Sequence, residues 1–171
     1  MVGLPDSALL TIANRLDCVL LSSERTAGLE TFARLVHESG PHAAGNFLTF
    51  SASRLPEVLA EVELFGFAGG AFPPPTGRHR AGRLLRASGG TLFISEIEHL
   101  GLLAQKELLR VIDRREVRPL KFDGTCPVQT RLIAGTGGDL ADAVAAGRFR
   151  RDLYERLATT VIAVPPATQL R

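Results

Sequence analysis

Five short, continuously apolar runs divide this sequence, and a segment with helical spacing follows each of the first four. Consecutive apolar residues, as opposed to alternating ones, are typical of strands that helices cover on both faces. The repeated order of strand, helix and strand therefore predicts an α/β fold with three layers, in which a parallel sheet is flanked by helices. The expected strands cover 18–21, 47–50, 91–94, 131–134 and 160–164. The expected helices cover 4–16, 30–37, 56–64, 102–114, 139–146 and 151–157.

Two stretches fall outside this pattern. The first, GFAGGAFPPPTGRHR, is rich in glycine and proline. The second, REVRPLKFDGTCPVQT, has the pattern of a β-hairpin with its turn at Asp123 and Gly124. Neither stretch is expected to belong to the parallel sheet.

Composition limits the classes of function. The chain has 171 residues, of which 45% are hydrophobic, and this predicts one domain over 1–171. The net charge of +2 gives no electrostatic reason to expect a membrane or nucleic acid as a general partner. No apolar run approaches the roughly 18 residues that span a bilayer and no signal peptide is evident, so a cytoplasmic location is expected. Cys18 and Cys126 lack metal-ligand spacing, so we expect reduced thiols and no metal site.

The stretch LLSSERTAGLETFAR, at 20–34, lies where an apolar strand gives way to a helix. Many nucleotide-binding proteins place a phosphate-binding loop there, with glycines that let backbone N–H groups converge on phosphate, followed by a Lys and a Ser or Thr. Here Gly28 is the only glycine, and Leu29 follows it. An apolar side chain cannot donate to a phosphate, so the rest of the chain must decide whether this loop works.

Four motifs, in this order and at these distances, resemble the AAA+ central domain of bacterial enhancer-binding proteins, which activate transcription by sigma-54 RNA polymerase. They are ELFGFAGGAF, GGTLFISEIEHL, LLRVIDRREVRPL and GRFRRDLYERL. The resemblance extends over about 18–166 and implies a P-loop NTPase-like AAA+ core. Members of that family hydrolyse ATP in a ring, and a helical lid and usually a DNA-binding helix-turn-helix follow the core. This chain matches the core to its end, so the resemblance implies a core without the lid subdomain.

The expected phosphate loop departs from the family pattern. The family's GESGTGKE matches 23–30 of this chain. Glu24, Gly28 and Glu30 are retained, whereas Leu29 stands at the position of the Lys. The resemblance therefore implies a vestigial phosphate loop.

Three further positions differ from those to which the family assigns chemistry. Ser95 stands where the family has the Asp that holds Mg²⁺, next to the retained catalytic carboxylate, Glu96. Ser51 replaces the Asn that couples this Glu to the state of the nucleotide. Gly137 replaces the Asn that senses the γ-phosphate. The domain is thus expected to be degenerate.

Phosphoryl transfer depends on Lys and Mg²⁺ to neutralise charge on the phosphates. Leu29 removes the Lys, and Ser95 weakens the binding of Mg²⁺. We therefore expect no ATP turnover and weak or absent binding of ATP and Mg²⁺. Glu96 would then be vestigial, or simply a cap of the following helix. Arg25 is either a stand-in for the Lys or a solvated side chain. In the alternative, ATP still binds through Gly28, Glu96 and backbone donors.

The loop GAFPPPT matches the family's GAFTGA, which contacts sigma-54, but three prolines replace Thr-Gly-Ala. Prolines favour a stiff polyproline II segment, whereas the family's loop changes conformation during the ATP cycle. The segment is either a docking surface for a protein partner or a loop that has lost its role. The candidate partner-binding residues are Gly70, Ala71, Phe72, Pro73, Pro74 and Pro75.

Arg150 and Arg156 match the family's arginine fingers, which act in trans in the next subunit of the ring. In one interpretation, this chain completes the site of an intact relative. The alternative is local pairing of Arg151 or Arg156 with Asp152 or Glu155. Under that alternative, Phe149 and Tyr154 pack into the core.

A basic cluster is the one signal for nucleic acid, and direct binding of nucleic acid is the third hypothesis. Its members are Arg78, His79, Arg80, Arg83 and Arg86. The first hypothesis is a catalytically inactive domain that regulates transcription or signalling through contacts with a protein, either an intact AAA+ activator or another regulator. The second is an ATP-binding, sigma-54-dependent regulator. Assembly with further copies of this chain is left open, and no membrane partner is expected.

Overall fold

The computed structural model describes residues 6–14, 18–24, 26–69 and 80–164. Predictions that concern Arg25, Arg78, His79 or the segment 70–76 lie outside this part of the chain. The strands are β1 (Val19–Ser22), β2 (Phe47–Ser51), β3 (Gly66–Phe67), β4 (Arg80–Ala81), β5 (Thr91–Ser95), β6 (Glu116–Val117), β7 (Cys126–Pro127), β8 (Arg131–Thr136) and β9 (Val161–Ala163). The helices are α1 (Asp6–Ala13), α2 (Leu29–Glu38), α3 (Glu57–Phe65), α4 (Arg83–Arg86), α5 (Leu102–Arg114), α6 (Leu140–Ala145) and α7 (Arg151–Leu157), with a 3-10 turn, η1, at Ile97–His99.

Five strands form one sheet in the order β2-β5-β8-β1-β9, and every neighbouring pair is parallel. All five strands therefore end at the same edge. β1, the first strand of the sheet along the chain, lies between β8 and β9, so the loop after it emerges beside the loop after β8. This arrangement confirms the predicted α/β fold. It also brings the expected phosphate loop, after β1, next to the loop after β8, which contains Gly137.

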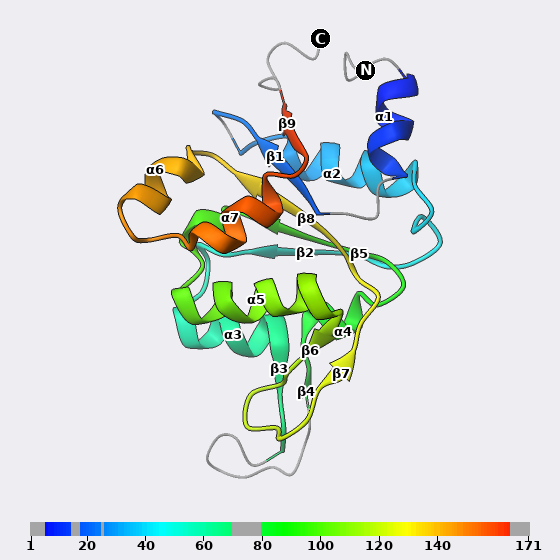
Figure 1. Ribbon diagram of the computed structural model, residues 1–171. Helices are drawn as coiled ribbons and strands as arrows, with labels where there is room; N and C mark the ends of the chain where they lie inside the picture. Colours follow the sequence, from blue (N-terminus) through cyan, green and yellow to red (C-terminus); the bar gives the residue numbers. More distant parts are fainter. Residues whose placement is uncertain (1–5, 15–17, 25, 70–79, 165–171) are drawn as a thin grey trace.

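Helices cover both faces of the sheet (Figure 1). On one face α2 packs against β1, β2, β5 and β8, and α1 packs against α2. On the other face lie α3, α5 and α7, which contact one another. The apolar side chains of β1 alternate between the two layers: Val19 and Leu21 belong to the cluster under α2, and Leu20 belongs to the cluster on the opposite face. Burial on both faces explains the continuous apolar runs.

Most expected elements occur within a few residues of their predicted bounds. The helices expected at 102–114 and 151–157 coincide with α5 and α7. The expected hairpin is present as the antiparallel pair of β6 and β7, with Asp123 and Gly124 in its connection. The first strand begins at Val19, so Cys18 precedes it and is not part of it.

A second antiparallel ribbon, β3 and β4, was not expected from the sequence. It pairs Gly66 with Ala81 and Phe67 with Arg80 at the two ends of the segment 70–79. Gly66 has φ of +81°, and a Cβ there would lie 2.4 Å from the Arg80 carbonyl oxygen, so this close approach requires glycine. An ion pair of Arg80 with Glu63 of α3, at 2.5 Å, ties the ribbon to the helix. The ribbon therefore places Phe67 and Arg80, the nearest paired residues on either side of the segment 70–79, close to α3.

Candidate functional site

A cavity of about 400 Å³ opens at the carboxyl ends of β1 and β8. Open parallel sheets bind their ligands outside the carboxyl ends of the strands. The cavity is lined by Leu20, Ser22, Ser23, Glu24, Thr136, Gly137, Gly138, Asp139, Leu140, Tyr154 and Val161. The beginning of the expected phosphate loop thus borders a space at the edge where such folds hold ligands.

The loop reaches α2 through a glycine in an unusual backbone conformation. Gly28 is left-handed, with φ of 100° and ψ of −18°, and glycine adopts this conformation without strain. The N–H of Leu29 donates to the carbonyl of Thr26 at 3.2 Å, and the N–H of Phe32 donates to the carbonyl of Gly28 at 3.0 Å. The N–H of Leu29 is therefore engaged inside the loop.

The side chain of Leu29 belongs to the hydrophobic core. It is 1% exposed and lies in the cluster between α2 and the sheet. A Cβ built on Gly135 of β8 would lie 3.3 Å from its Cδ1 atom and 2.9 Å from the ring of Phe93. At the position where the resemblance implies a phosphate-binding Lys, the structure has an apolar side chain that packs against the sheet.

The two retained acidic residues of the loop lie in different surroundings. Glu24 is exposed and borders the cavity of about 400 Å³. Glu30 forms an exposed ion pair with Arg34 at 3.5 Å, one helical turn further along α2. Pairs of this kind contribute little to stability. Neither carboxylate offers a positive group to a phosphate.

Glu96 is held by two serines, one at the end of β2 and one in the loop after it. Its Oε2 atom accepts hydrogen bonds from Ser51 Oγ at 2.8 Å and from Ser53 Oγ at 2.5 Å. These two bonds hold the pKa of the Glu96 carboxyl below its ordinary value, against the opposing effect of desolvation. Glu96 stands before η1 in a left-handed conformation, but its side chain caps no backbone N–H there. The alternative that it caps the following helix is therefore wrong.

Ser95 lies beside a second cavity, of about 320 Å³, between α2 and the ends of β2 and β5. Its Oγ atom is 3.4 Å from the carbonyl of Phe50. Two arginines, Arg54 and Arg83, also line this cavity, and Arg83 donates to the carbonyl of Thr49 at 2.7 Å. The surroundings of Ser95 thus include two positive charges in addition to the carboxylate of Glu30.

Two residues that sequence reasoning missed meet at Gly137. Oε1 of Glu98 accepts the N–H of Gly137 at 3.2 Å, and Oε2 of Glu98 is buried without a hydrogen-bond partner in the described part of the chain. A Cβ on Gly137 would lie 2.9 Å from the methyl group of Thr26. A side chain from the loop and a carboxylate thus lie next to the position where the resemblance implies Asn.

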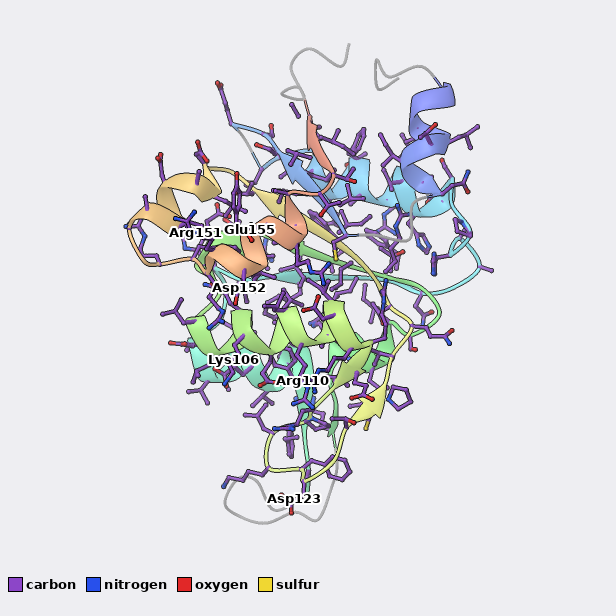
Figure 2. All side chains as sticks on the ribbon, in the orientation of Figure 1. Lys106, Arg110, Asp123, Arg151, Asp152 and Glu155 are labelled. Atoms are coloured by element: carbon purple, nitrogen blue, oxygen red, sulfur yellow. The ribbon has the colours of Figure 1, made fainter. Side chains whose placement is uncertain are left out.

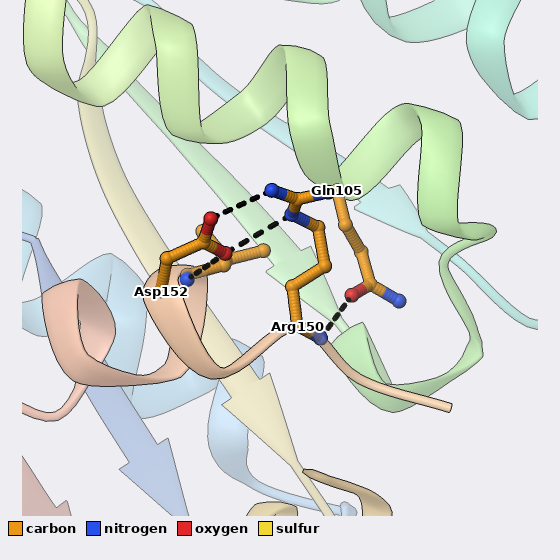
Figure 3. A network of polar contacts seen from close by, with 4 residues as sticks. Gln105, Arg150 and Asp152 are labelled. Atoms are coloured by element: carbon orange, nitrogen blue, oxygen red, sulfur yellow. Dashed lines mark hydrogen bonds and ion pairs between the residues drawn. The ribbon is translucent and has the colours of Figure 1, made fainter. Parts of the chain in front are cut away.

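Arg150 is bound within its own chain. Figure 3 shows its guanidinium on Asp152, with Nε at 3.0 Å from Oδ1 and Nη2 at 2.6 Å from Oδ2. This contact lowers the pKa of the Asp152 carboxyl. The backbone N–H of Arg150 donates to Oε1 of the fully buried Gln105, at 2.8 Å. Gln105 therefore fixes the start of α7 against α5.

Arg156 also has an intrachain partner, Asp113 near the end of α5, at 2.6 Å. Arg156 thus forms an ion pair within the chain, as the alternative predicts, but its partner is Asp113 and not Asp152 or Glu155. Arg151, Asp152 and Glu155 are neighbours on α7 (Figure 2), yet Arg151 forms neither of its expected pairs in the described part of the chain. The predicted packing of Phe149, which is 2% exposed, and of Tyr154 against the core is confirmed.

The described residues contain neither a metal-binding cluster nor a membrane-spanning helix. No three His, Cys, Asp or Glu side chains among them are grouped as a metal ion would require. No helix among them has the length and apolar character to cross a membrane. Neither Cys18 nor Cys126 forms a disulfide in the described part of the chain.

A model of the family described as "Sigma-54 interaction domain" matches residues 7–163. This chain belongs to the sigma-54 interaction domain family. The match takes in the sheet, the helices on both faces and both candidate loops, and it confirms the family to which the four motifs point. The fold is accordingly that of the AAA+ core of bacterial enhancer-binding proteins.

Curated relatives in this family are transcription regulators. The C4-dicarboxylate transport transcriptional regulatory protein DctD of Rhizobium meliloti (strain 1021) is 41% identical over 153 residues, which are 90% of this chain and 33% of DctD. The Nif-specific regulatory protein of Rhodobacter capsulatus is 44% identical over 148 residues, which are 86% of this chain and 25% of that protein. The chain thus spans about a quarter to a third of the length of these relatives.

Solved structures have the same architecture. NtrX from Brucella abortus in complex with ATP superposes with a TM-score of 0.82 at 27% identity, over 94% of this chain and 36% of NtrX. The P-loop NTPase domain of a sigma-54 transport activator from E. coli superposes with a TM-score of 0.59 at 23% identity, over 94% of this chain and 92% of that domain. The second likeness supports the P-loop NTPase fold.

Proposed function

We propose that this chain acts in sigma-54-type transcription regulation as a core domain that does not turn over ATP and works through protein contacts. The burial of Leu29 in the core carries this proposal, because the position expected to neutralise phosphate charge is committed to packing. Ser95, at the expected Mg²⁺ position, brings no charge to a metal ion. The relatives supply the setting, since those named above are transcription regulators.

The energetic cost of leucine at the Lys position and serine at the Mg²⁺ position argues against ATP turnover. Phosphoryl transfer in this fold depends on a Lys and a Mg²⁺ ion that offset charge on the β- and γ-phosphates. Loss of one well-placed electrostatic contact typically costs about 3 to 4 kcal/mol of transition-state stabilisation. Glu96 keeps a lowered pKa and therefore its charge, but a carboxylate without a metal-bound nucleotide has no water to activate.

A protein partner is the remaining route to function. The candidate contact residue is Phe72, next to the three prolines Pro73–Pro75, because prolines restrict the unbound loop and so reduce the cost of ordering it. The β3–β4 ribbon, which flanks the segment 70–79 in the sequence, is anchored to α3 through Glu63 and Arg80. We expect Phe72→Ala to weaken binding of the native partner by about 2 kcal/mol or more, with nearly unchanged thermal stability. Pull-downs that recover the same partners with Phe72→Ala as with the original chain would contradict this proposal.

A second candidate is a regulator that still binds nucleotide. The cavity of about 400 Å³ at the ends of β1 and β8 and the left-handed Gly28 favour it. NtrX of Brucella abortus, which has been solved with ATP and with ADP, supports it by similarity. Binding would then use backbone donors and Glu96, with no contribution from Leu29.

Titration with Mg-ATP separates the two candidates. A ligand at a hundred times its dissociation constant stabilises a protein by about 2.7 kcal/mol, so a bound nucleotide raises the melting temperature measurably. For the first candidate we expect no shift and no phosphate release above the blank. Phosphate release that disappears in Glu96→Ala, or open complexes formed in vitro with this chain as the sole activator, would overturn the proposed loss of turnover. A shift without release would favour the second candidate.

A further inference from the structure

A third cavity, of about 270 Å³, lies at the opposite edge of the sheet from the expected phosphate loop. It is formed where the loops before β2 and β8 meet the end of α5. Its lining residues are His42, Arg115, Val128, Gln129, Thr130 and Arg131. The described lining therefore contains two arginines and a histidine and no carboxylate.

Arg131 is a buried cation that lacks a carboxylate partner in the described part of the chain. Its side chain is 1% exposed, and its Nη1 and Nη2 atoms donate to the carbonyls of Ala13 and Ile12 at 2.9 and 2.7 Å. Its Nε atom is buried and has no hydrogen-bond partner among the described residues. The two carbonyls are at the C-terminal end of α1, where a helix carries a partial charge of about −0.5. Hence the helix end offsets only part of the guanidinium charge.

His42 adds a second buried polar atom without a partner in the described structure, its Nδ1. Burial lowers the pKa of His42, and the charges of Arg131 and Arg115 lower it further. Arg115 donates to the carbonyl of Thr130 at 3.4 Å, which keeps it at the rim of the cavity. Burial and the two arginine charges thus both favour the neutral form of His42.

We propose that this cavity binds an oxyanion of the phosphate type, either free or as the terminal group of a small metabolite. A tetrahedral oxyanion offers acceptors to the Nε atom of Arg131 and to His42, and its negative charge offsets two guanidinium groups. Charge-assisted hydrogen bonds of this kind are the strongest that arginine forms. Buried charges in proteins are normally paired, and an anion in this cavity completes the pairing of Arg131.

The anion should also change the titration of His42. Two cationic groups act on this residue, Arg131 and Arg115, in addition to its burial. A bound anion opposes their effect and raises the pKa of His42. Affinity for the anion then increases as the pH falls through that value, because the protonated ring adds a donor and a charge.

The probe is inorganic phosphate, compared with chloride at equal ionic strength and with glycerol 3-phosphate. We expect phosphate to raise the melting temperature more than chloride does, and to move the NMR titration of the His42 ring to higher pH. Arg115→Gln should weaken phosphate binding about tenfold, as the loss of a charge-assisted contact does. The matched control is Arg114→Gln, which removes an equal charge from the adjacent exposed residue outside the cavity.

The result that overturns the proposal is equally specific. If phosphate stabilises no more than chloride, the cavity binds no oxyanion. If Arg115→Gln and Arg114→Gln weaken binding equally, or if phosphate leaves the His42 titration unchanged, any stabilisation arises elsewhere and the proposed site is wrong. Tighter binding of glycerol 3-phosphate than of phosphate identifies the terminal group of a metabolite, and the reverse identifies the free ion.

Discussion

Leu29 packs directly over Gly135: a Cβ built on Gly135 would come within 3.3 Å of the Leu29 Cδ1 atom. One residue begins α2 and the other lies in β8, so the contact joins the helix to the middle of the sheet. The absence of a side chain at Gly135 leaves room for the leucine. The sheet therefore accommodates an apolar side chain at the position where the resemblance implies a Lys.

Leu29→Lys should destabilise the protein rather than create a phosphate site. Replacing a leucine that is 1% exposed leaves a cavity or buries an ammonium group, and either should cost about 3 kcal/mol or more. Urea denaturation measures the loss. Leu29→Met, which conserves volume, is the control and should cost less than about 1.5 kcal/mol. A stable Leu29→Lys variant that hydrolyses ATP would contradict both the packing argument and the proposed loss of turnover.

Removal of the two serines at Glu96 should raise the pKa of its carboxyl. Ser53 and Ser51 stabilise the charged form through hydrogen bonds, so Ser51→Ala with Ser53→Ala should bring the pKa back toward the ordinary value of 4.5. Because the folded-state pKa is lowered, the contribution to stability is present above pH 4.5 and is lost as the pH falls through the folded-state value. The doubly substituted protein should therefore lose less stability on acidification. NMR titration of the Glu96 carboxyl carbon measures the shift, and an unchanged pKa would show that the hydrogen bonds are not its cause.

The three inner strands of the sheet, β1, β5 and β8, were predictable because they are buried on both faces. The run at 131–134 is continuous, and in β8 Ile133 faces one core while Leu132 and Ala134 face the other. The β3–β4 ribbon was not predictable, since its strands have two residues each and their pairing depends on backbone contacts at Gly66. Such short elements carry no periodic pattern.

The candidate site was predictable only in part. The family resemblance links Ser51 to Glu96, since Ser51 stands at the position of the Asn that couples this Glu to the state of the nucleotide. In the structure, a hydrogen bond of 2.8 Å joins the two side chains. Ser53 and Glu98 were missed because their contacts depend on how two loops fold over each other. The burial of Leu29 had a signal, since Phe32 and Val36 lie three and seven positions later on the same apolar face.

His37, which is buried, and His42, which is partly buried, should make stability depend on pH near neutrality. Burial lowers the pKa of His37, and although Glu38 opposes this, Arg131 and Arg34 add to the decrease. His37 Nδ1 is 2.9 Å from Thr91 Oγ1, which suits a neutral ring. The folded-state values for His37 and His42 lie below 6.5, so the unfolded chain binds more protons and stability falls as the pH drops below 6.5.

The slope from each histidine is at most about 1.4 kcal/mol per pH unit. Denaturation between pH 7.5 and 5 measures it. His37→Gln removes one titrating group and should flatten the curve in that range, whatever its effect on stability at pH 7.5. His99→Gln, at an exposed position, serves as the control and should leave the curve unchanged. A flat curve for the original chain would show that these rings are protonated as easily when folded as when unfolded.

The ion pair of Arg156 with Asp113 should contribute little to stability, which bears on the proposal that Arg156 acts in trans. The side chains are 57% and 38% exposed, and exposed pairs typically contribute about 0.2 to 1 kcal/mol. We therefore expect Arg156→Gln and Asp113→Asn each to lower the free energy of unfolding by less than about 1 kcal/mol. The double variant should be no less stable than the less stable of the two single variants. A double-mutant cycle in urea measures the coupling. A pair this weak can open at low cost and leave Arg156 available to a neighbouring subunit, whereas a coupling above about 2 kcal/mol would bind Arg156 to α5 and argue against a role in trans.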